Sequence, residues 1–111
     1  MPRRNPIGNL DLVILSVLIR LGDEAYGVAI SREIKDTTGS EVALGTIYAV
    51  LQRLGRDGMV TSSLGESTPE RGGRAKRYFR ITAKGLKEVN QMRRALGRLW
   101  RGVPELAGEK V

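Results

Sequence analysis

The chain has 111 residues, a length that predicts a single domain with a modest hydrophobic core. It contains neither cysteine nor histidine, which excludes disulfides, thiol chemistry, ordinary zinc sites and acid–base catalysis by histidine. Its net charge of +7 indicates a polyanionic partner, of which nucleic acid is the commonest and an anionic membrane surface is the rival.

The N-terminal part is predicted to be a basic arm followed by a helix. Residues 1–8 carry prolines at positions 2 and 6, which favour an extended backbone. Neither this arm nor the apolar run after it has the pattern of a signal peptide or the length of a membrane span, so we expect a cytoplasmic protein without a membrane partner. From Leu10 to Leu21, apolar side chains recur at three- and four-residue steps, which predicts an amphipathic helix with Asn9 as its N-cap and Gly22 as its stop.

Two more amphipathic helices are predicted over residues 26–37 and 44–57. Gly39 marks the end of the first, and Gly58 follows the second as a C′ glycine. The pair is typical of a helix-turn-helix, whose second helix enters the major groove of DNA. The alternative is an ordinary three-helix core whose third helix exposes a solvated face. The inward face of that third helix is predicted to hold Ile47, Val50, Leu51 and Leu54.

A β-hairpin is predicted next. Its strands cover residues 59–64 and 76–82, and the polar, turn-rich segment 65–73 lies between them. In the second strand, period-two alternation places Phe79 and Ile81 on one face and Tyr78 and Arg80 on the other.

This hairpin is rich in positive charge. Between residues 71 and 80 there are five lysines and arginines and no acidic residue. Because like charges repel, we expect an anion to offset them, and arginines suit a DNA backbone or a narrow minor groove. The alternative is a charged hairpin in contact with solvent alone. The five residues are Arg71, Arg74, Lys76, Arg77 and Arg80.

The last helix is predicted over residues 83–104, with Thr82 as its cap and Pro104 as its stop, and residues 105–111 are expected to fray. Its apolar stripe repeats close to a heptad. A winged helix is usually complete after its second strand, so the stripe favours a dimer arm over packing on the domain's own core. The predicted dimerisation residues are Leu86, Val89, Met92, Leu96, Leu99, Trp100 and Val103.

Together, these elements predict a mainly α fold with a small β-hairpin. A winged helix-turn-helix domain covers residues 9–82, and a C-terminal dimerisation helix covers 83–104. On the third helix, the Tyr48 hydroxyl can donate to a phosphate, the Gln52 amide can read a base edge, and Arg56 adds charge further along. The predicted DNA-binding residues are Thr46, Tyr48, Gln52, Arg53, Arg74, Lys76 and Arg77.

Several short motifs, in this order along the chain, resemble the PadR family of bacterial transcriptional regulators. The resemblance covers residues 8–102 and implies a homodimeric winged-helix repressor of the short form, with a single C-terminal helix for dimerisation. It implies DNA contacts at Thr46, Tyr48, Arg53, Arg74 and Lys76. The motifs are Tyr26-Gly27, Gly45-Thr46-Ile47-Tyr48, Leu51, Arg53, Leu54, Asp57-Gly58-Met59-Val60, Gly73-Arg74 and the run from Arg77 to Gly85.

The family resemblance also predicts an effector site and identifies one position at which this sequence differs from relatives. Some relatives bind small aromatic or drug-like effectors at the dimer interface, beside a tryptophan of the last helix, which makes Trp100 and Leu96 the candidate effector residues. Ala43 departs from the pattern, because relatives often place a serine there. The predicted third helix thereby loses a cap worth about 1 kcal/mol and one phosphate contact.

We therefore expect a sequence-specific transcriptional regulator, a homodimeric repressor of a pseudo-palindromic operator that a small aromatic or apolar effector releases. Two alternatives remain open: a DNA-binding regulator that needs no ligand, and a winged-helix module for protein–protein assembly. An RNA-binding protein would need an exposed aromatic platform, which the sequence lacks. The acidic residues are scattered and no nucleotide-binding motif is present, so we expect neither an enzyme nor a cofactor.

Overall fold

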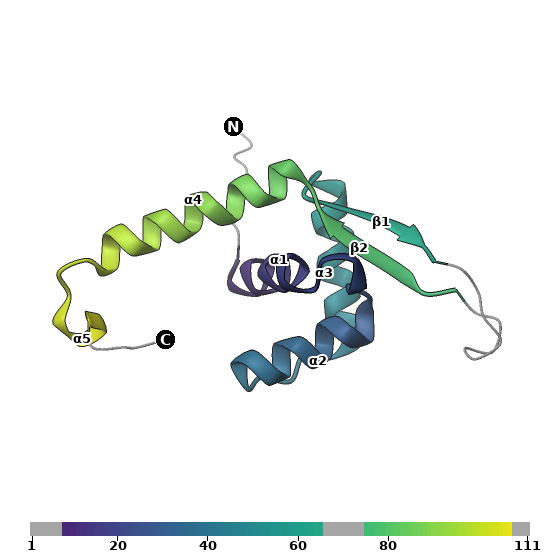
Figure 1. Ribbon diagram of the computed structural model, residues 1–111, viewed down its shortest axis with the longest axis horizontal. Helices are drawn as coiled ribbons and strands as arrows, with labels where there is room; N and C mark the ends of the chain where they lie inside the picture. Colours follow the sequence, from purple (N-terminus) through teal and green to yellow (C-terminus); the bar gives the residue numbers. More distant parts are fainter. Residues whose placement is uncertain (1–7, 66–74, 108–111) are drawn as a thin grey trace.

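The computed structural model describes residues 8–65 and 75–107 (Figure 1). Three helices and a two-stranded sheet pack together as a head (residues 8–65 and 75–82), and a long helix extends away from it (Figure 1). Within these described residues, no helix is long and apolar enough to cross a membrane. The elements are α1 (Asn9–Leu21), the 3-10 turn η1 (Gly22–Glu24), α2 (Gly27–Thr38), α3 (Leu44–Arg56), β1 (Val60–Leu64), β2 (Arg77–Ile81), α4 (Ala83–Trp100) and α5 (Pro104–Ala107).

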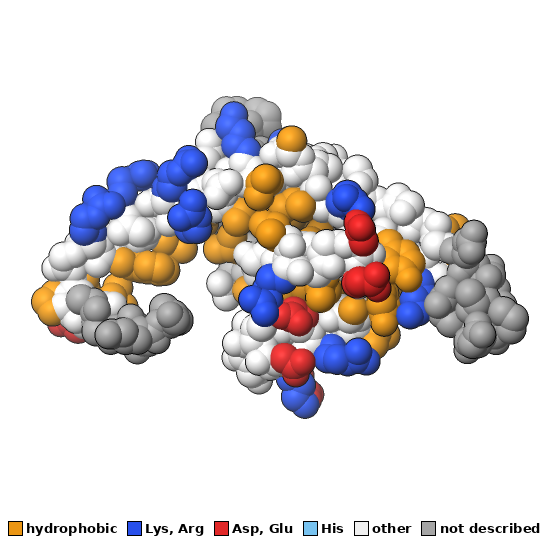
Figure 2. Space-filling view, in the orientation of Figure 1, with side chains coloured by type: hydrophobic (Ala, Val, Ile, Leu, Met, Phe, Trp, Pro, Cys, Tyr) orange, Lys and Arg blue, Asp and Glu red, His pale blue; other side chains and the backbone are white. Residues whose placement is uncertain are grey.

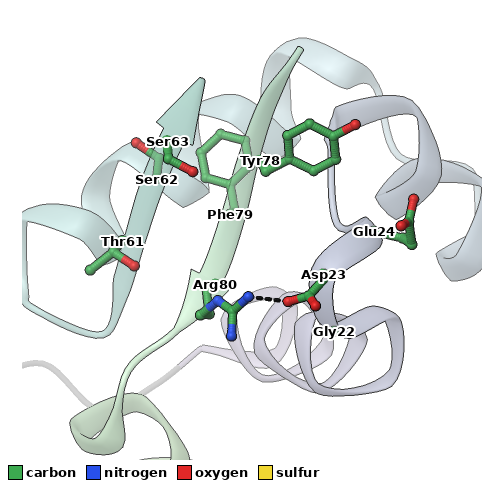
Figure 3. Close-up of a pocket in the computed structure, with 9 residues that line it drawn as sticks. All are labelled: Gly22, Asp23, Glu24, Thr61, Ser62, Ser63, Tyr78, Phe79 and Arg80. Atoms are coloured by element: carbon green, nitrogen blue, oxygen red, sulfur yellow. Dashed lines mark hydrogen bonds and ion pairs between the residues drawn. The ribbon is translucent and has the colours of Figure 1, made fainter. Parts of the chain in front are cut away.

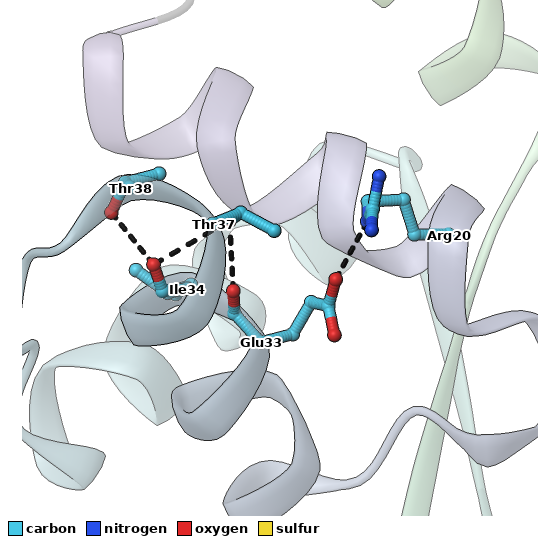
Figure 4. Close-up of polar contacts among 5 residues, drawn as sticks. All are labelled: Arg20, Glu33, Ile34, Thr37 and Thr38. Carbon is cyan, nitrogen blue, oxygen red and sulfur yellow. Dashed lines mark hydrogen bonds and ion pairs between the residues drawn. The ribbon is translucent and has the colours of Figure 1, made fainter.

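The ends of α1, α2 and α3 follow local chemistry and fall within one or two residues of the predicted bounds. Asn9, predicted to be the N-cap of α1, is its first helical residue, and Gly8 occupies the cap position. Gly39 ends α2 and Gly58 follows α3, each with a φ of 80°, which an L side chain rarely adopts. At the end of α2, Thr38 Oγ1 donates to the Ile34 carbonyl at 2.7 Å (Figure 4).

The core of the head lies between α1, α2 and α3. The predicted inward set of α3 is confirmed, because Ile47, Val50, Leu51 and Leu54 are all buried. An ion pair of 2.6 Å between Arg20 Nε and Glu33 Oε2 ties α1 to α2 at the surface of this core (Figure 4). The largest fully buried side chains are Ile14, Leu15, Leu18, Ile30, Ile34, Ile47, Leu51 and Leu54.

The predicted hairpin is confirmed as an antiparallel pair, with Ser62 opposite Phe79. Phe79 is buried, whereas Arg80 on the other face is exposed, as the alternation predicts. One edge contact was not predicted: the Phe79 amide donates to the Ala25 carbonyl at 2.8 Å, and Tyr26 forms a β-bridge with Tyr78. The segment between η1 and α2 therefore extends the small sheet.

The joint between the head and α4 is tight. Thr82 caps α4 as predicted, since its Oγ1 accepts from the Gly85 amide at 3.1 Å and donates to the Gly58 carbonyl at 2.7 Å. Gly85 is buried against the strand, and a Cβ placed on it would lie 2.5 Å from the Met59 carbonyl oxygen. Only glycine allows this approach of the helix to the backbone before β1.

The C-terminal end of α4 differs from the prediction. The helix ends at Trp100 rather than at Pro104: the backbone becomes extended at Arg101, with a ψ of 130°, and Gly102 then adopts a φ of 77°. Pro104 does not stop a helix but begins one, α5, which includes residues expected to fray. Proline suits a first helical position because its φ is already helical and its missing N–H needs no partner there.

Candidate nucleic-acid interface

The solvent-facing side of α3 has small residues in its first half. At 100° per residue, its centre is formed by Gly45, Ala49, Gln52 and Arg56, and all four are exposed. A Cβ placed on Gly45 would meet nothing within 4 Å among the described residues, so packing within that part of the chain does not require glycine there. Two residues with little or no side chain allow another surface to approach the helix backbone closely.

A groove runs between α3 and the hairpin, which we call the α3–hairpin groove. Its volume is about 600 Å³. Leu51, Val60 and Phe79 contribute apolar lining, and the polar lining comes from both elements. Arg77 Nη1 donates to Ser62 Oγ at 3.1 Å, which holds its guanidinium across the hairpin. Guanidinium and hydroxyl donors of this kind suit phosphate oxygens. The polar lining consists of Gln52, Arg56, Thr61, Ser62 and Arg77.

Tyr48 lies at the edge of the groove and is 42% exposed. Its ring centroid is 6.2 Å from that of Phe79, and its hydroxyl lies where a Cβ of residue 27 would be. Glycine at position 27 therefore lets α3 pack against the start of α2 through Tyr48. This contact gives a structural reason for Gly27 and Tyr48, each of which belongs to one of the motifs that resemble the family. The phosphate contact of Tyr48 stays a prediction.

Of the predicted wing residues, Lys76 and Arg77 lie within the described structure, and Arg71 and Arg74 lie outside it. Lys76 is half-buried, and its Nζ lies 3.8 Å from the centroid of the Tyr26 ring. This cation–π contact fixes the ammonium group beside the start of α2. Lys76 and Arg77 both line a hollow that also includes Tyr26 and the α3 residue Tyr48.

Arg53 occupies a different environment from the other predicted contacts. Its Nη1 and Nη2 donate to the two carboxylate oxygens of Asp11 at 2.9 and 2.7 Å, a bidentate pair between α3 and α1. The hydrogen bonds from Arg53 hold the pKa of the Asp11 carboxyl below its ordinary value, although burial acts in the opposite direction. The same bonds raise the pKa of Arg53. Asp11 is the one buried charged residue within the described part of the chain.

The outer face of the hairpin is electrostatically different from the α3 side. Arg80 forms an ion pair with Asp23 of η1, and Glu24 lies beside them in a hollow of about 280 Å³ (Figure 3). Arg80 therefore has its charge matched locally and points away from α3. Within residues 8–65 and 75–107, no three potential metal-ligating side chains gather into a site.

The predicted dimerisation and effector residues lie along α4, except Val103, which follows the end of the helix. The space-filling view shows apolar side chains on the side of α4 that faces the head (Figure 2). Val89 is an exception, because it is buried in the core of its own chain and needs no partner to exclude water. Leu99 is 70% exposed and Trp100 51% exposed, one turn beyond Leu96. The remaining predicted positions are Leu86, which is exposed, and Met92, Leu96 and Val103, which are half-buried.

Comparison with known proteins gives a consistent result. Residues 14–91 match the family described as the transcriptional regulator PadR-like family. An uncharacterized protein of Lysinibacillus sphaericus is 32% identical over 87 residues, which span 77% of this chain and 75% of that protein. A transcriptional regulator from Clostridium thermocellum has a similar structure, with 30% identity, a TM-score of 0.69, and coverage of 87% of this chain and 91% of that one.

A further solved structure bears on the fold alone. Bacillus subtilis PadR, in complex with operator DNA, is 24% identical, with a TM-score of 0.64 and coverage of 75% of this chain and 46% of that chain. The likeness confirms the predicted winged-helix architecture, mainly helical with a small β-hairpin.

Proposed function

Because the chain belongs to the PadR-like family of transcriptional regulators, we propose that it acts as a homodimer that represses transcription from a pseudo-palindromic operator. Membership in this family also makes the chain a regulator rather than an enzyme. The observation that carries the proposal is the exposed outer face of α3, with small residues in its first half and the α3–hairpin groove beside it. A location in the cytoplasm, where operator DNA is found, is part of the same proposal.

In this proposal α3 enters the major groove. The small side chains of Gly45 and Ala49 let the helix backbone approach the DNA, and the exposed Gln52 amide reads a base edge. Arg56 and Arg77 then bind a sugar–phosphate strand that lies in the α3–hairpin groove. Thr46, Tyr48, Lys76 and Arg74 supply the flanking contacts. The operator complex of Bacillus subtilis PadR, which shares this fold, supports DNA as the ligand.

Dimerisation is proposed through the apolar stripe of α4. Leu99 and Trp100 expose most or half of their surface, and a large exposed apolar patch marks an interaction site. A second copy of the same stripe covers it by two-fold symmetry and places two α3 helices for two half-sites. The proposed interface comprises Leu86, Met92, Leu96, Leu99, Trp100 and Val103.

We also propose that a small aromatic effector releases the protein from its operator. Trp100 and Leu96 lie one turn apart on one side of α4, and an indole ring suits stacking with a flat apolar molecule. A ligand bound between two such helices would change the spacing of the heads. The test is quenching of Trp100 fluorescence during release of DNA. A Trp100→Ala protein that still responds fully to the effector contradicts this role of Trp100. If no flat apolar compound releases the wild type from DNA, the ligand-independent alternative holds.

The DNA-binding claim is tested by fluorescence anisotropy with the protein's own upstream DNA and with random duplex, over a range of salt concentrations. Replacing Arg56 and Arg77 with Gln is expected to weaken upstream binding at least ten-fold and to reduce the slope of log K against log salt by about 1.8. Arg20→Gln is the control, because Arg20 is ion-paired with Glu33 away from α3. Equal binding of both DNAs by the wild type contradicts a sequence-specific regulator and favours the assembly module.

The dimer is tested by sedimentation at several protein concentrations. Leu99→Asp is expected to give monomers, because a carboxylate in an apolar interface loses its hydration. Leu64→Asp is the matched control, since Leu64 is 61% exposed on the hairpin. A Leu99→Asp protein that sediments like the wild type would contradict the proposed interface.

A further inference from the structure

The positive charge of this protein is concentrated on α4 rather than on the head. The described head residues, 8–65 and 75–82, carry eight lysines and arginines and seven acidic residues. Residues 83–101 carry six lysines and arginines and one acidic residue. The net charge that first pointed to a polyanion therefore lies mostly on the long helix.

These charges are ordered along one side of α4. Lys87, Arg94, Arg98 and Arg101, which we call the α4 basic row, follow one another at steps of seven, four and three residues, and Arg101 lies directly after the last helical residue. At 100° per residue, the three that lie within the helix fall opposite the apolar stripe. All four are exposed, and the space-filling view shows basic side chains along the edge of α4 that faces away from the head (Figure 2).

Half of the cations of the described head are paired with acids. Of its eight lysines and arginines, Arg20, Lys35, Arg53 and Arg80 each form an ion pair with an acidic side chain. Within residues 8–65 and 75–107, no member of the α4 basic row forms such a pair. Like charges at helical spacing repel one another, and an anion bound along the row would relieve that repulsion.

We propose that the α4 basic row binds the phosphate backbone of a second DNA segment without regard to sequence, while the heads hold the operator. The row is about 16 Å long from Lys87 to Arg98, at 1.5 Å per residue, and a DNA strand presents a phosphate every 3.4 Å along the axis, so the row meets about five phosphates. Because the row faces away from the head, the DNA it binds is not the strand in the α3–hairpin groove.

Duplex DNA fits this row better than an anionic membrane does. A membrane-bound amphipathic helix buries its apolar face in the lipid, and that face of α4 is the proposed dimer interface. Binding through the basic row leaves the apolar stripe available to the partner subunit. The inference rests on the proposed function, because it assumes that the chain forms a dimer and that the heads bind the operator. The charge of the α4 basic row follows from the sequence and does not depend on that proposal.

The experiment measures capture of a second duplex. The dimer is loaded on an immobilised upstream fragment that occupies both heads, and a fluorescent random duplex is added. Replacing Lys87, Arg94 and Arg98 with Gln is expected to reduce the captured duplex per bound protein at least ten-fold. The salt slope of capture is expected to fall by about 2.7, whereas affinity for the upstream fragment changes less than three-fold.

The matched control removes the same number of charges from ion-paired positions of the head, with Arg20, Lys35 and Arg80 replaced by Gln. It is expected to retain capture. Equal loss in both variants would show that only net charge matters and would overturn the assignment, as would unchanged capture in the row variant. Sedimentation and thermal melting of the row variant should match the wild type, because the three side chains are exposed.

Two further measurements, of vesicle binding and of the preference for upstream DNA, distinguish the remaining outcomes. If the row variant loses binding to phosphatidylserine vesicles but keeps DNA capture, the row is a membrane surface and the proposal is wrong. If the wild type shows no preference for its upstream DNA, the proposed function is wrong. The α4 basic row is then tested separately, by titrating the row variant and the control variant directly with random duplex. If the row binds DNA, the row variant binds the random duplex more weakly than the control variant.

Discussion

The Asp11–Arg53 pair offers the sharpest test of how α3 is held. Asp11→Asn keeps the shape of the side chain but removes its charge. The Asp11 side chain is 10% exposed and the Arg53 side chain 45% exposed, so the pair is buried on one side only. Breaking a fully buried pair costs about 3–5 kcal/mol, and hydrogen bonds to charged groups contribute about 1.5–3 kcal/mol. Because Arg53 can regain water, we expect a loss of about 2 kcal/mol in the free energy of unfolding.

Urea and thermal unfolding at a fixed protein concentration measure this loss, since a dimer's stability depends on concentration. A loss of 2 kcal/mol corresponds to a fall of about 10 °C in Tm for a domain of this size. The pKa of Asp11 is lowered in the folded protein, so its stabilisation is present above the pKa of an unfolded aspartate, about 3.9, and is lost as the pH falls through the folded value. The difference between wild type and variant should therefore shrink in acid.

The same pair decides whether Arg53 contacts DNA or positions α3. If Arg53 acts through Asp11, then Asp11→Asn and Arg53→Gln both weaken upstream binding, leave the salt slope unchanged and combine non-additively in the double variant. If Arg53 contacts a phosphate, Arg53→Gln alone lowers the slope by about 0.9. Additive effects of the two changes, or a stability loss below about 0.5 kcal/mol for Asp11→Asn, would refute the positioning role.

Three glycines give further predictions. Gly27→Ala drives a methyl group into the Tyr48 hydroxyl and is expected to cost about 1–3 kcal/mol in urea unfolding, with partial recovery when Tyr48 is changed to Phe. Gly45→Leu meets open space and should leave unfolding unchanged or slightly harder, yet weaken upstream DNA at least ten-fold in anisotropy; undiminished affinity would mean that DNA does not approach this face. Gly85→Ala places its Cβ 2.5 Å from the Met59 carbonyl oxygen and should lower thermal stability by about 2 kcal/mol, and an unchanged Tm would show that α4 shifts freely on the strand.

Local features of the fold were predictable from the sequence because they depend on neighbours in the chain. The apolar period located the helices, and glycines at positions 39 and 58 end α2 and α3 since no other residue adopts a φ of 80° without strain. The Thr82 cap and the alternation of β2 follow in the same way from side chains within a few residues. The predicted end of α4 was wrong, because the extended backbone of Arg101 and the positive φ of Gly102 depend on the path of the chain, and Pro104 begins α5 instead of stopping α4.

Contacts between distant residues were decided by the tertiary structure. Arg53 is predicted to contact DNA because it lies on α3, and that contact stays a prediction; its pairing with Asp11, 42 residues earlier in the chain, was not predicted. Val89 continued the apolar stripe of α4, yet it packs into the core of its own head. The spacing of residues along the chain does not predict such contacts, since each depends on how three helices and a hairpin pack together.

The amino-acid sequence was enough to predict the order of the elements, the family and the net charge of +7. The distribution of that charge over the surface depends on the folded structure. Folding pairs Arg20 with Glu33 and Arg80 with Asp23 across different elements, and it turns the α4 basic row away from the head, because Val89 on the opposite side of the same helix packs into the core. The number of charges does not say on which surface they lie. For the α4 basic row, that surface is determined by the opposite face of α4, which packs against the head.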